Sequence, residues 1–177
     1  MVSRSNVDAG STPQLPPTPE ALRAAADTRA AAFGRILALL MASPRHSKMS
    51  LGEANVYVTP AVASGQIALI GAQQTEGGPM ALAAAAWWAF VSADVDQRLT
   101  ASREPFLKLE ANEWQCGEQP WIIDAIGEPR LVNDLVKKLA ERNFRGKPVK
   151  LRAILPDGRI AVGKLEPKEA AAEPAKS

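Results

Sequence analysis

The chain has 177 residues, of which 46% are hydrophobic and 23% are charged, and its formal net charge is +2. Domains usually contain about 100–200 residues, and this charged fraction is average, so the values indicate one ordinary globular domain and exclude a fibre or a disordered polyelectrolyte. A net charge this small gives no reason to expect a nucleic-acid partner, because phosphate binding needs clustered Lys and Arg.

Single cysteine and histidine residues limit the metal and disulfide chemistry of the chain. Cys116 alone excludes an internal disulfide and a Cys-rich metal site, and His46 alone excludes a two-histidine site. Residues 1–17 lack the apolar stretch of a secretory signal, and the longest apolar run, Met80–Val91, is shorter than the ~20 residues needed to cross a bilayer. We therefore expect a cytoplasmic protein with a reduced thiol, no transmembrane segment and no metal.

The two ends of the chain differ in composition from its middle. Residues 1–18 are rich in Ser, Pro, Thr and Gly, and residues 164–177 consist mostly of Ala, Glu, Lys and Pro. Such segments bury too little apolar surface to offset their ordering entropy. We predict disorder in both segments and one folded domain over residues 19–163.

The first predicted element is a helix from Pro19 to about Ser43. Thr18 is a good N-cap, proline is tolerated at the first helical position, and Glu20 complements the helix dipole. Pro44 ends the helix, because it disfavours helical geometry in the residue before it. Apolar residues recur at spacings of three and four along the segment, at Leu22, Ala26, Ala30, Phe33, Ile36, Leu37 and Leu40.

Three strands are predicted next, at Asn55–Val62, Gln66–Ala72 and Met80–Phe90. Valines at even spacing indicate the first strand, and Pro60 within it indicates a bulge or a sheet edge. Thr75–Pro79 is a strong turn signal before the third strand. The alanine run Ala83–Ala86 in that strand also suits a helix.

The remaining segments complete a mixed domain. We predict a helix over Ser92–Arg103, a strand over Trp121–Ile126, a helix from Leu131 to about Asn143, and a hairpin of Val149–Leu155 and Arg159–Val162. Pro156-Asp157-Gly158 supplies the hairpin turn. The predicted fold class is α+β, with a mixed and mostly antiparallel sheet flanked by helices.

Two residues are the first candidates for chemistry. His46 follows the first predicted helix, and histidine is the side chain whose ordinary pKa suits a general base near neutral pH. Asp124 lies inside the apolar run 121–126, where a charge is costly unless it is paired or functional. The alternatives are a surface histidine in a loop, and a strand with Ile123 and Ala125 on one face and Asp124 toward water.

Cys116 and the four tryptophans also have two interpretations. Cys116 with His46 and Asp124 would supply a thiol nucleophile, but no local feature lowers the cysteine pKa, and Glu118 nearby opposes thiolate formation. The tryptophans are expected to pack the core and line a pocket. Stacking on nucleic-acid bases is disfavoured, because no basic residues are interleaved with them.

Four segments carry a recognisable pattern in a fixed order. They are Ser43-Pro44-Arg45-His46, Pro60-Ala61-Val62 with Gln66, Pro79 through Trp88-Ala89, and Trp114-x-x-Gly117-Glu118-x-x-Trp121-x-x-Asp124. In order and spacing they resemble the RTX toxin-activating lysine acyltransferases, from about residue 35 to about residue 145. The last segment is the most specific of the four.

The resemblance implies a function and a set of site residues. Members have a fold similar to that of the GNAT acetyltransferases and move a fatty acyl chain from acyl carrier protein to internal lysines of an RTX-type protoxin or a related secreted repeat protein. The resemblance also implies a homodimer. Acyl-acyl carrier protein is the expected donor, with no tightly bound cofactor. The catalytic residues correspond to His46 as the general base, Asp124 and Ser43, and substrate or acyl-chain binding is assigned to Trp88, Trp114, Trp121 and Gln66.

The expected reaction explains why these residue types are needed. A lysine amine has an ordinary pKa near ~10.4, so at neutral pH almost all of it is ammonium and cannot attack a thioester. A neutral imidazole within hydrogen-bond reach can accept the proton as the nitrogen attacks. Asp124 would orient that imidazole or hold the incoming ammonium. Arg45, Lys48 and Arg98 are candidate contacts for the acidic carrier protein.

The chain departs from the family pattern after Asp124. Ala125-Ile126-Gly127-Glu128-Pro129 stands where the family has Trp-x-Ala-Pro-Phe-Gly, which is expected to reshape the acyl pocket. Two other functions stay open. A coenzyme A-dependent N-acetyltransferase would need a pyrophosphate loop, and Gln74-x-x-Gly77-x-Pro79 fails that pattern at its last position. The other alternative is a non-catalytic partner or chaperone of a secreted repeat protein.

Overall fold

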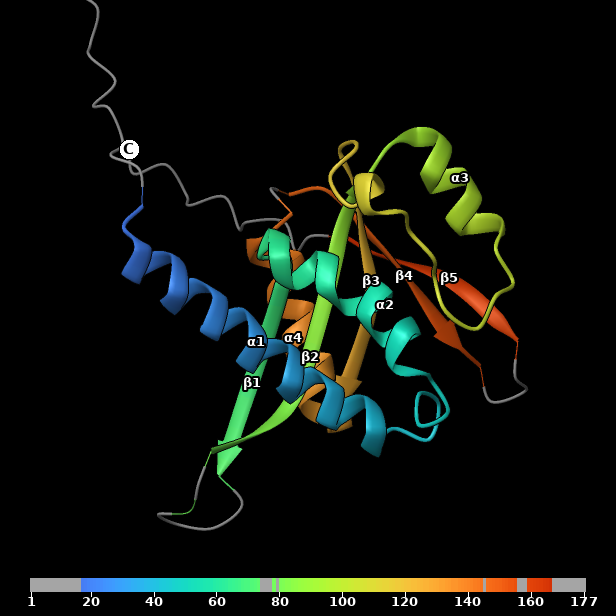
Figure 1. The fold of residues 1–177 in the computed structure, drawn as a ribbon. Helices are drawn as coiled ribbons and strands as arrows, with labels where there is room; N and C mark the ends of the chain where they lie inside the picture. The colour runs from blue at the N-terminus through green and yellow to red at the C-terminus, as the bar shows by residue number, and fades with distance from the viewer. Residues whose placement is uncertain (1–16, 74–77, 79, 145, 156–158, 167–177) are drawn as a thin grey trace, which may run out of the picture.

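The computed structural model describes the chain except residues 1–16, 74–77, 79, 145, 156–158 and 167–177. Its elements are α1 (Pro19–Ala42), α2 (Leu51–Ser64), β1 (Ile67–Gln73), β2 (Met80–Val91), α3 (Ala93–Ala101), the short 3₁₀ helix η1 (Ala111–Glu113), β3 (Gln119–Gly127), α4 (Pro129–Arg142), β4 (Val149–Ile154) and β5 (Ile160–Leu165). The arrangement is α+β with a mixed sheet, as predicted (Figure 1). The likeness to the GNAT fold stays a prediction.

The sheet has the strand order β1-β2-β3-β4-β5. All neighbouring strands are antiparallel except β3 and β4, which run parallel. Among the described residues, β3 pairs with β4 at Trp121 and Ile122, whereas its later residues as far as Gly127 pair with β2. The second half of β3 therefore borders a gap on its β4 side.

Helices cover both faces of the sheet. In Figure 1, α1 and α2 cross the near face and α4 lies behind it, and two separate clusters of buried side chains match these two layers. Alternating residues of β2 enter the two clusters, with Trp87 on the α1–α2 side and Trp88 on the α4 side. The alanines at 84, 85 and 86 are fully buried, so this run is a central strand packed on both faces.

The predicted strand over Asn55–Val62 is wrong, because this segment belongs to helix α2. Ser50 and Glu53 form a capping box at its start, and Gly65 ends it in the left-handed region. Pro60 removes one backbone hydrogen bond, but the helix continues because one face of it is buried. The buried residues have helical spacing: Ala54, Tyr57, Val58, Ala61 and Val62.

The other predicted elements are confirmed with shifts of a few residues at their ends. Helix α1 begins with Thr18 as N-cap, whose side-chain oxygen accepts a hydrogen bond from the Ala21 amide. The turn predicted at Pro156–Gly158 lies outside the described residues, as does all of the turn predicted at Thr75–Pro79 except Gly78. Most of the two segments predicted to be disordered also lie outside them. Strand β5 extends to Leu165. Within the described residues, no helix is both long enough and apolar enough to span a membrane.

Candidate active site

The end of α1 places His46 inside the protein. Ser43 is the C-cap of α1, and the next residues form a tight turn in which the His46 amide donates to the Ser43 carbonyl oxygen at 2.9 Å. The imidazole is almost fully buried, and its ring centre lies 5.0 Å from that of Phe106. The alternative of a surface histidine is therefore wrong.

A β-bulge directs Asp124 toward the same place. Trp87 of β2 lies opposite Asp124 and Trp88 lies opposite Ile122, so Ile123 is an extra residue on β3. Ile123 belongs to the cluster under α1 and α2, and the Asp124 side chain reaches groups on that same side instead of alternating away from it. Asp124 is buried, so the alternative that turned it toward water is wrong as well.

Asp124 accepts hydrogen bonds at both of its oxygens. Its Oδ2 atom lies 2.7 Å from His46 Nε2, 2.8 Å from the Tyr57 hydroxyl and 2.9 Å from Arg45 Nη2. Its Oδ1 atom accepts from the Ala125 amide at 2.8 Å. Burial, and then the Asp124 charge, raise the pKa of Tyr57 well above its usual value, so the hydroxyl stays protonated and donates.

These contacts fix the roles of the two imidazole nitrogens. Because the Asp124 carboxylate only accepts hydrogen bonds, we assign the imidazole proton to Nε2 from the hydrogen-bond network. In the neutral ring Nδ1 is then the acceptor, and it lies 2.8 Å from Ser43 Oγ. The result is a chain in which the half-buried Ser43 hydroxyl donates to buried His46, and His46 donates to Asp124.

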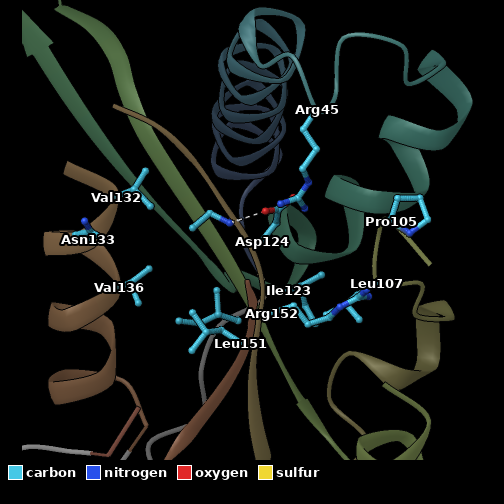
Figure 2. A pocket seen from close by; sticks show the side chains of 12 residues that line it. Arg45, Pro105, Leu107, Ile123, Asp124, Val132, Asn133, Val136, Leu151 and Arg152 are labelled. Atoms are coloured by element: carbon cyan, nitrogen blue, oxygen red, sulfur yellow. Dashed lines mark hydrogen bonds and ion pairs between the residues drawn. The ribbon is translucent and has the colours of Figure 1, made fainter. Parts of the chain in front are cut away.

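A polar cavity of about 180 Å³ borders Asp124 on the side of the gap between β3 and β4. Figure 2 shows Asp124, Arg45 and Arg152 around it, with α4 side chains on one wall and Pro105 and Leu107 on the other. Arg152 Nη2 donates to the Glu104 carbonyl oxygen, whereas Nη1 is buried without a hydrogen-bond partner. Burial lowers the pKa of the Arg152 guanidinium. The polar cavity thus has two guanidinium groups, those of Arg45 and Arg152, in its lining beside Asp124.

The four residues assigned to acyl-chain binding occupy different places. Trp88 packs on Phe144 on the α4 side of the sheet, and the Trp121 indole donates to Asp96 at 2.7 Å. The Gln66 amide donates to the Trp114 carbonyl oxygen. Of the four, Trp114 borders a described cavity, an apolar one beside α2.

Of the other candidate residues, Cys116 and Arg98 lie outside the His46–Asp124 site, whereas Arg45 belongs to it. Cys116 is exposed, and its sulfur accepts from the Ser92 amide at 3.2 Å; no described contact joins it to His46 or Asp124. Arg98 is paired with Glu113, whereas Arg45 is part of the site. Within the described residues, no group of three or more His, Cys, Asp or Glu side chains is arranged to hold a metal ion.

Sequence reasoning missed Tyr57 and Phe106. The predicted strand over Asn55–Val62 contained Tyr57, and its hydroxyl reaches Asp124 only because this segment is a helix packed on the sheet. Phe106 lies in a loop without a recognisable pattern, and it contacts both the His46 ring and the Arg45 guanidinium. The helical spacing and the capping box at Ser50 were the available signals for Tyr57.

A comparison with models of known protein families gives a match over most of the chain. The family model described as the RTX toxin acyltransferase family matches residues 25–162, which include Ser43, His46 and Asp124. No curated protein sequence matches the chain significantly.

Proposed function

The chain belongs to the RTX toxin acyltransferase family, and on that premise we propose that it transfers a fatty acyl chain from acyl carrier protein to internal lysines of an RTX protoxin. The family is one of acyltransferases that act on RTX toxins, so acyl transfer follows from membership. The observation that carries the finer proposal is the chain of hydrogen bonds from Ser43 through His46 to Asp124. In this chain the accepting imidazole nitrogen, Nδ1, faces the half-buried Ser43 hydroxyl.

His46 is the general base of the proposed reaction. At pH 7 roughly one lysine amine in 2,500 is uncharged, because its ordinary pKa is near ~10.4. The uncharged amine nitrogen bonds to the thioester carbonyl carbon, and as it does so it gives a proton to the Ser43 hydroxyl, which gives its own proton to His46 Nδ1. The carbon–sulfur bond then breaks, and the imidazolium returns that proton through the Ser43 hydroxyl to the leaving thiolate, so the products are the amide and the free thiol. Such general-base catalysis contributes typically 10²–10⁴-fold.

Asp124 acts on the imidazole rather than on the substrate ammonium in this proposal. Three donors already share Oδ2 and the Ala125 amide holds Oδ1, which favours a carboxylate that fixes the His46 tautomer and stabilises the imidazolium. Arg45 and Tyr57 keep that carboxylate in place. An incoming ammonium would have to displace one of these donors.

The polar cavity is the proposed site of the donor thioester. Arg45 and Arg152 both line this cavity and supply two cations that would attract the thioester carbonyl oxygen. Acyl carrier protein is acidic, and the exposed Arg45 and Lys48, three residues apart in the chain, are the proposed contacts of complementary charge. No tightly bound cofactor is needed, because the thioester is already activated.

One experiment tests the activity and its donor. The protein is incubated with an RTX protoxin and an acyl thioester of either acyl carrier protein or coenzyme A, and acylated lysines are found by mass spectrometry. We expect modified lysines with the carrier-protein donor and at least tenfold slower transfer from coenzyme A. Equal rates with both donors would favour the coenzyme A-dependent acetyltransferase alternative.

The matched control is His46→Ala, which removes the base and leaves the carrier-binding surface unchanged. We expect it to remain folded, to bind acyl carrier protein and to lose transfer. A folded and active His46→Ala protein would contradict the mechanism, and an inactive parent that still binds the protoxin would support the non-catalytic partner alternative. Light scattering tests the homodimer, which we propose from the family resemblance.

A further inference from the structure

An apolar cavity of about 310 Å³ lies between α2 and the segment 106–110. Its three charged neighbours, Glu53, Lys108 and Glu110, are exposed, so their charges remain in solvent. The side chains that give the wall its apolar character are Met49, Val56, Tyr57, Phe106, Leu109 and Trp114. A wall of this composition suits a hydrocarbon ligand without charge.

Two of the wall residues also touch the proposed catalytic residues. The Phe106 ring centre is 5.0 Å from that of His46, and Tyr57 donates its hydroxyl hydrogen bond to Asp124. Leu107 borders both this apolar cavity and the polar cavity beside Asp124. The two cavities therefore lie on either side of Leu107 and next to the His46–Asp124 pair. Arg45, Arg152 and Asp124 line the polar cavity, whereas mostly apolar side chains line the other.

We propose that the apolar cavity binds the fatty acyl chain of the donor while its thioester lies in the polar cavity. This inference rests on the proposed function. The cavity has about twice the volume of the ~150 Å³ engineered cavity that takes up benzene, so it suits roughly a dozen chain carbons.

A third cavity, next to the apolar one, would accommodate longer acyl chains. Val56, Leu109 and Trp114 also border a wider space of about 800 Å³ that continues along α2 past Thr59. An acyl chain longer than the apolar cavity would extend into this wider space, which is more open to water. The first dozen carbons therefore determine most of the binding, and further methylenes add less.

Gly52 offers a direct way to shorten the cavity. It borders the cavity on the first turn of α2, and an added Cβ would meet only Ser50 Oγ at 4.0 Å. Gly52→Leu should therefore fold, since a helical glycine is replaced by a better helix former. Val56→Phe narrows the cavity from the next turn. The matched control is Gly34→Leu, at an exposed glycine of α1 with no atom within 4 Å of its added Cβ.

Transfer rates are measured with acyl carrier protein carrying chains of 6, 8, 12 and 14 carbons. Each methylene withdrawn from an apolar site weakens binding about fourfold. We expect Gly52→Leu and Val56→Phe to slow transfer of the 12- and 14-carbon chains at least tenfold and that of the 6-carbon chain less than twofold. Gly34→Leu should keep the parent profile. An unchanged chain-length profile in both cavity variants would overturn the proposal.

A second measurement does not depend on transfer. Dodecanoic acid with a terminal diazirine is photolysed with the parent and with His46→Ala, and the labelled residues are mapped by mass spectrometry. We expect label on Met49, Val56 or Trp114 in both proteins and at least tenfold less in Gly52→Leu. Label elsewhere, or label unaffected by Gly52→Leu, refutes the acyl-chain site. If the parent protein is labelled in the apolar cavity but transfers no acyl chain to the protoxin, the proposed function is refuted and the acyl-chain site is not.

Discussion

Replacing Asp124 with asparagine tests whether its charge serves catalysis or only packing. Asparagine keeps the shape of the side chain, but one of its two terminal atoms becomes a donor. If the amide nitrogen took the Oδ2 position, it would face Arg45, Tyr57 and the His46 Nε2 proton, which are all donors. We therefore expect the oxygen to stay there and the nitrogen to face the Ala125 amide, which loses its partner.

Typical energies of such contacts set the size of both effects. An unsatisfied buried amide costs about 1–3 kcal/mol of folding stability. For a protein of this length, each kcal/mol shifts the melting temperature by about 2–4 °C, so Asp124→Asn should melt roughly 2–12 °C lower. A charge-assisted hydrogen bond to the imidazolium is worth about 1.5–3 kcal/mol, which corresponds to about a tenfold to 150-fold loss of rate.

The assay compares transfer from acyl carrier protein by Asp124→Asn and by Tyr57→Phe, well below both melting temperatures. Tyr57→Phe removes one hydrogen bond to the same Oδ2 atom but leaves the carboxylate charge, so it serves as the matched control. We expect it to lose less than tenfold in rate. If Asp124→Asn melts lower but retains a rate within twofold of the parent, Asp124 has only a structural role and the mechanism is refuted.

Three further predictions follow from the same contacts. Ser43→Ala should slow transfer about tenfold without abolishing it, since the amine can approach His46 Nδ1 directly; complete loss, measured with the same transfer assay, would mean that the hydroxyl is indispensable. The pKa of the Tyr57 hydroxyl is raised in the folded protein, so as the pH rises past about 10 this hydroxyl ionises in the unfolded chain first. The free energy of unfolding should therefore fall above that pH, and urea titrations of Tyr57→Phe should show a smaller fall. Gly127→Ala should destabilise the protein by at least about 2 kcal/mol in urea unfolding, because Gly127 has a φ of +123° and an added Cβ would lie 2.1 Å from the Ala83 carbonyl oxygen; an unchanged midpoint would contradict this.

Local sequence signals predicted most of the elements. Thr18 and Pro44 set the ends of α1, and the periodic leucines and valines after Pro129 identified α4, because capping and amphipathic spacing act within a few residues. They failed at α2, where valines at even positions and Pro60 indicated a strand. Burial of a helical face against the sheet outweighed that local preference.

The order and spacing of four segments were enough to single out His46 and Asp124, but the sequence did not determine how these residues meet. An alternating strand would turn Asp124 away from the face that holds Ile123, and the bulge opposite Trp87 places both on the same side. That bulge depends on how two strands far apart in the chain pair. Arg45 and Tyr57 reach Asp124 from two other segments, so the buried, fully hydrogen-bonded carboxylate exists only in the packed tertiary structure.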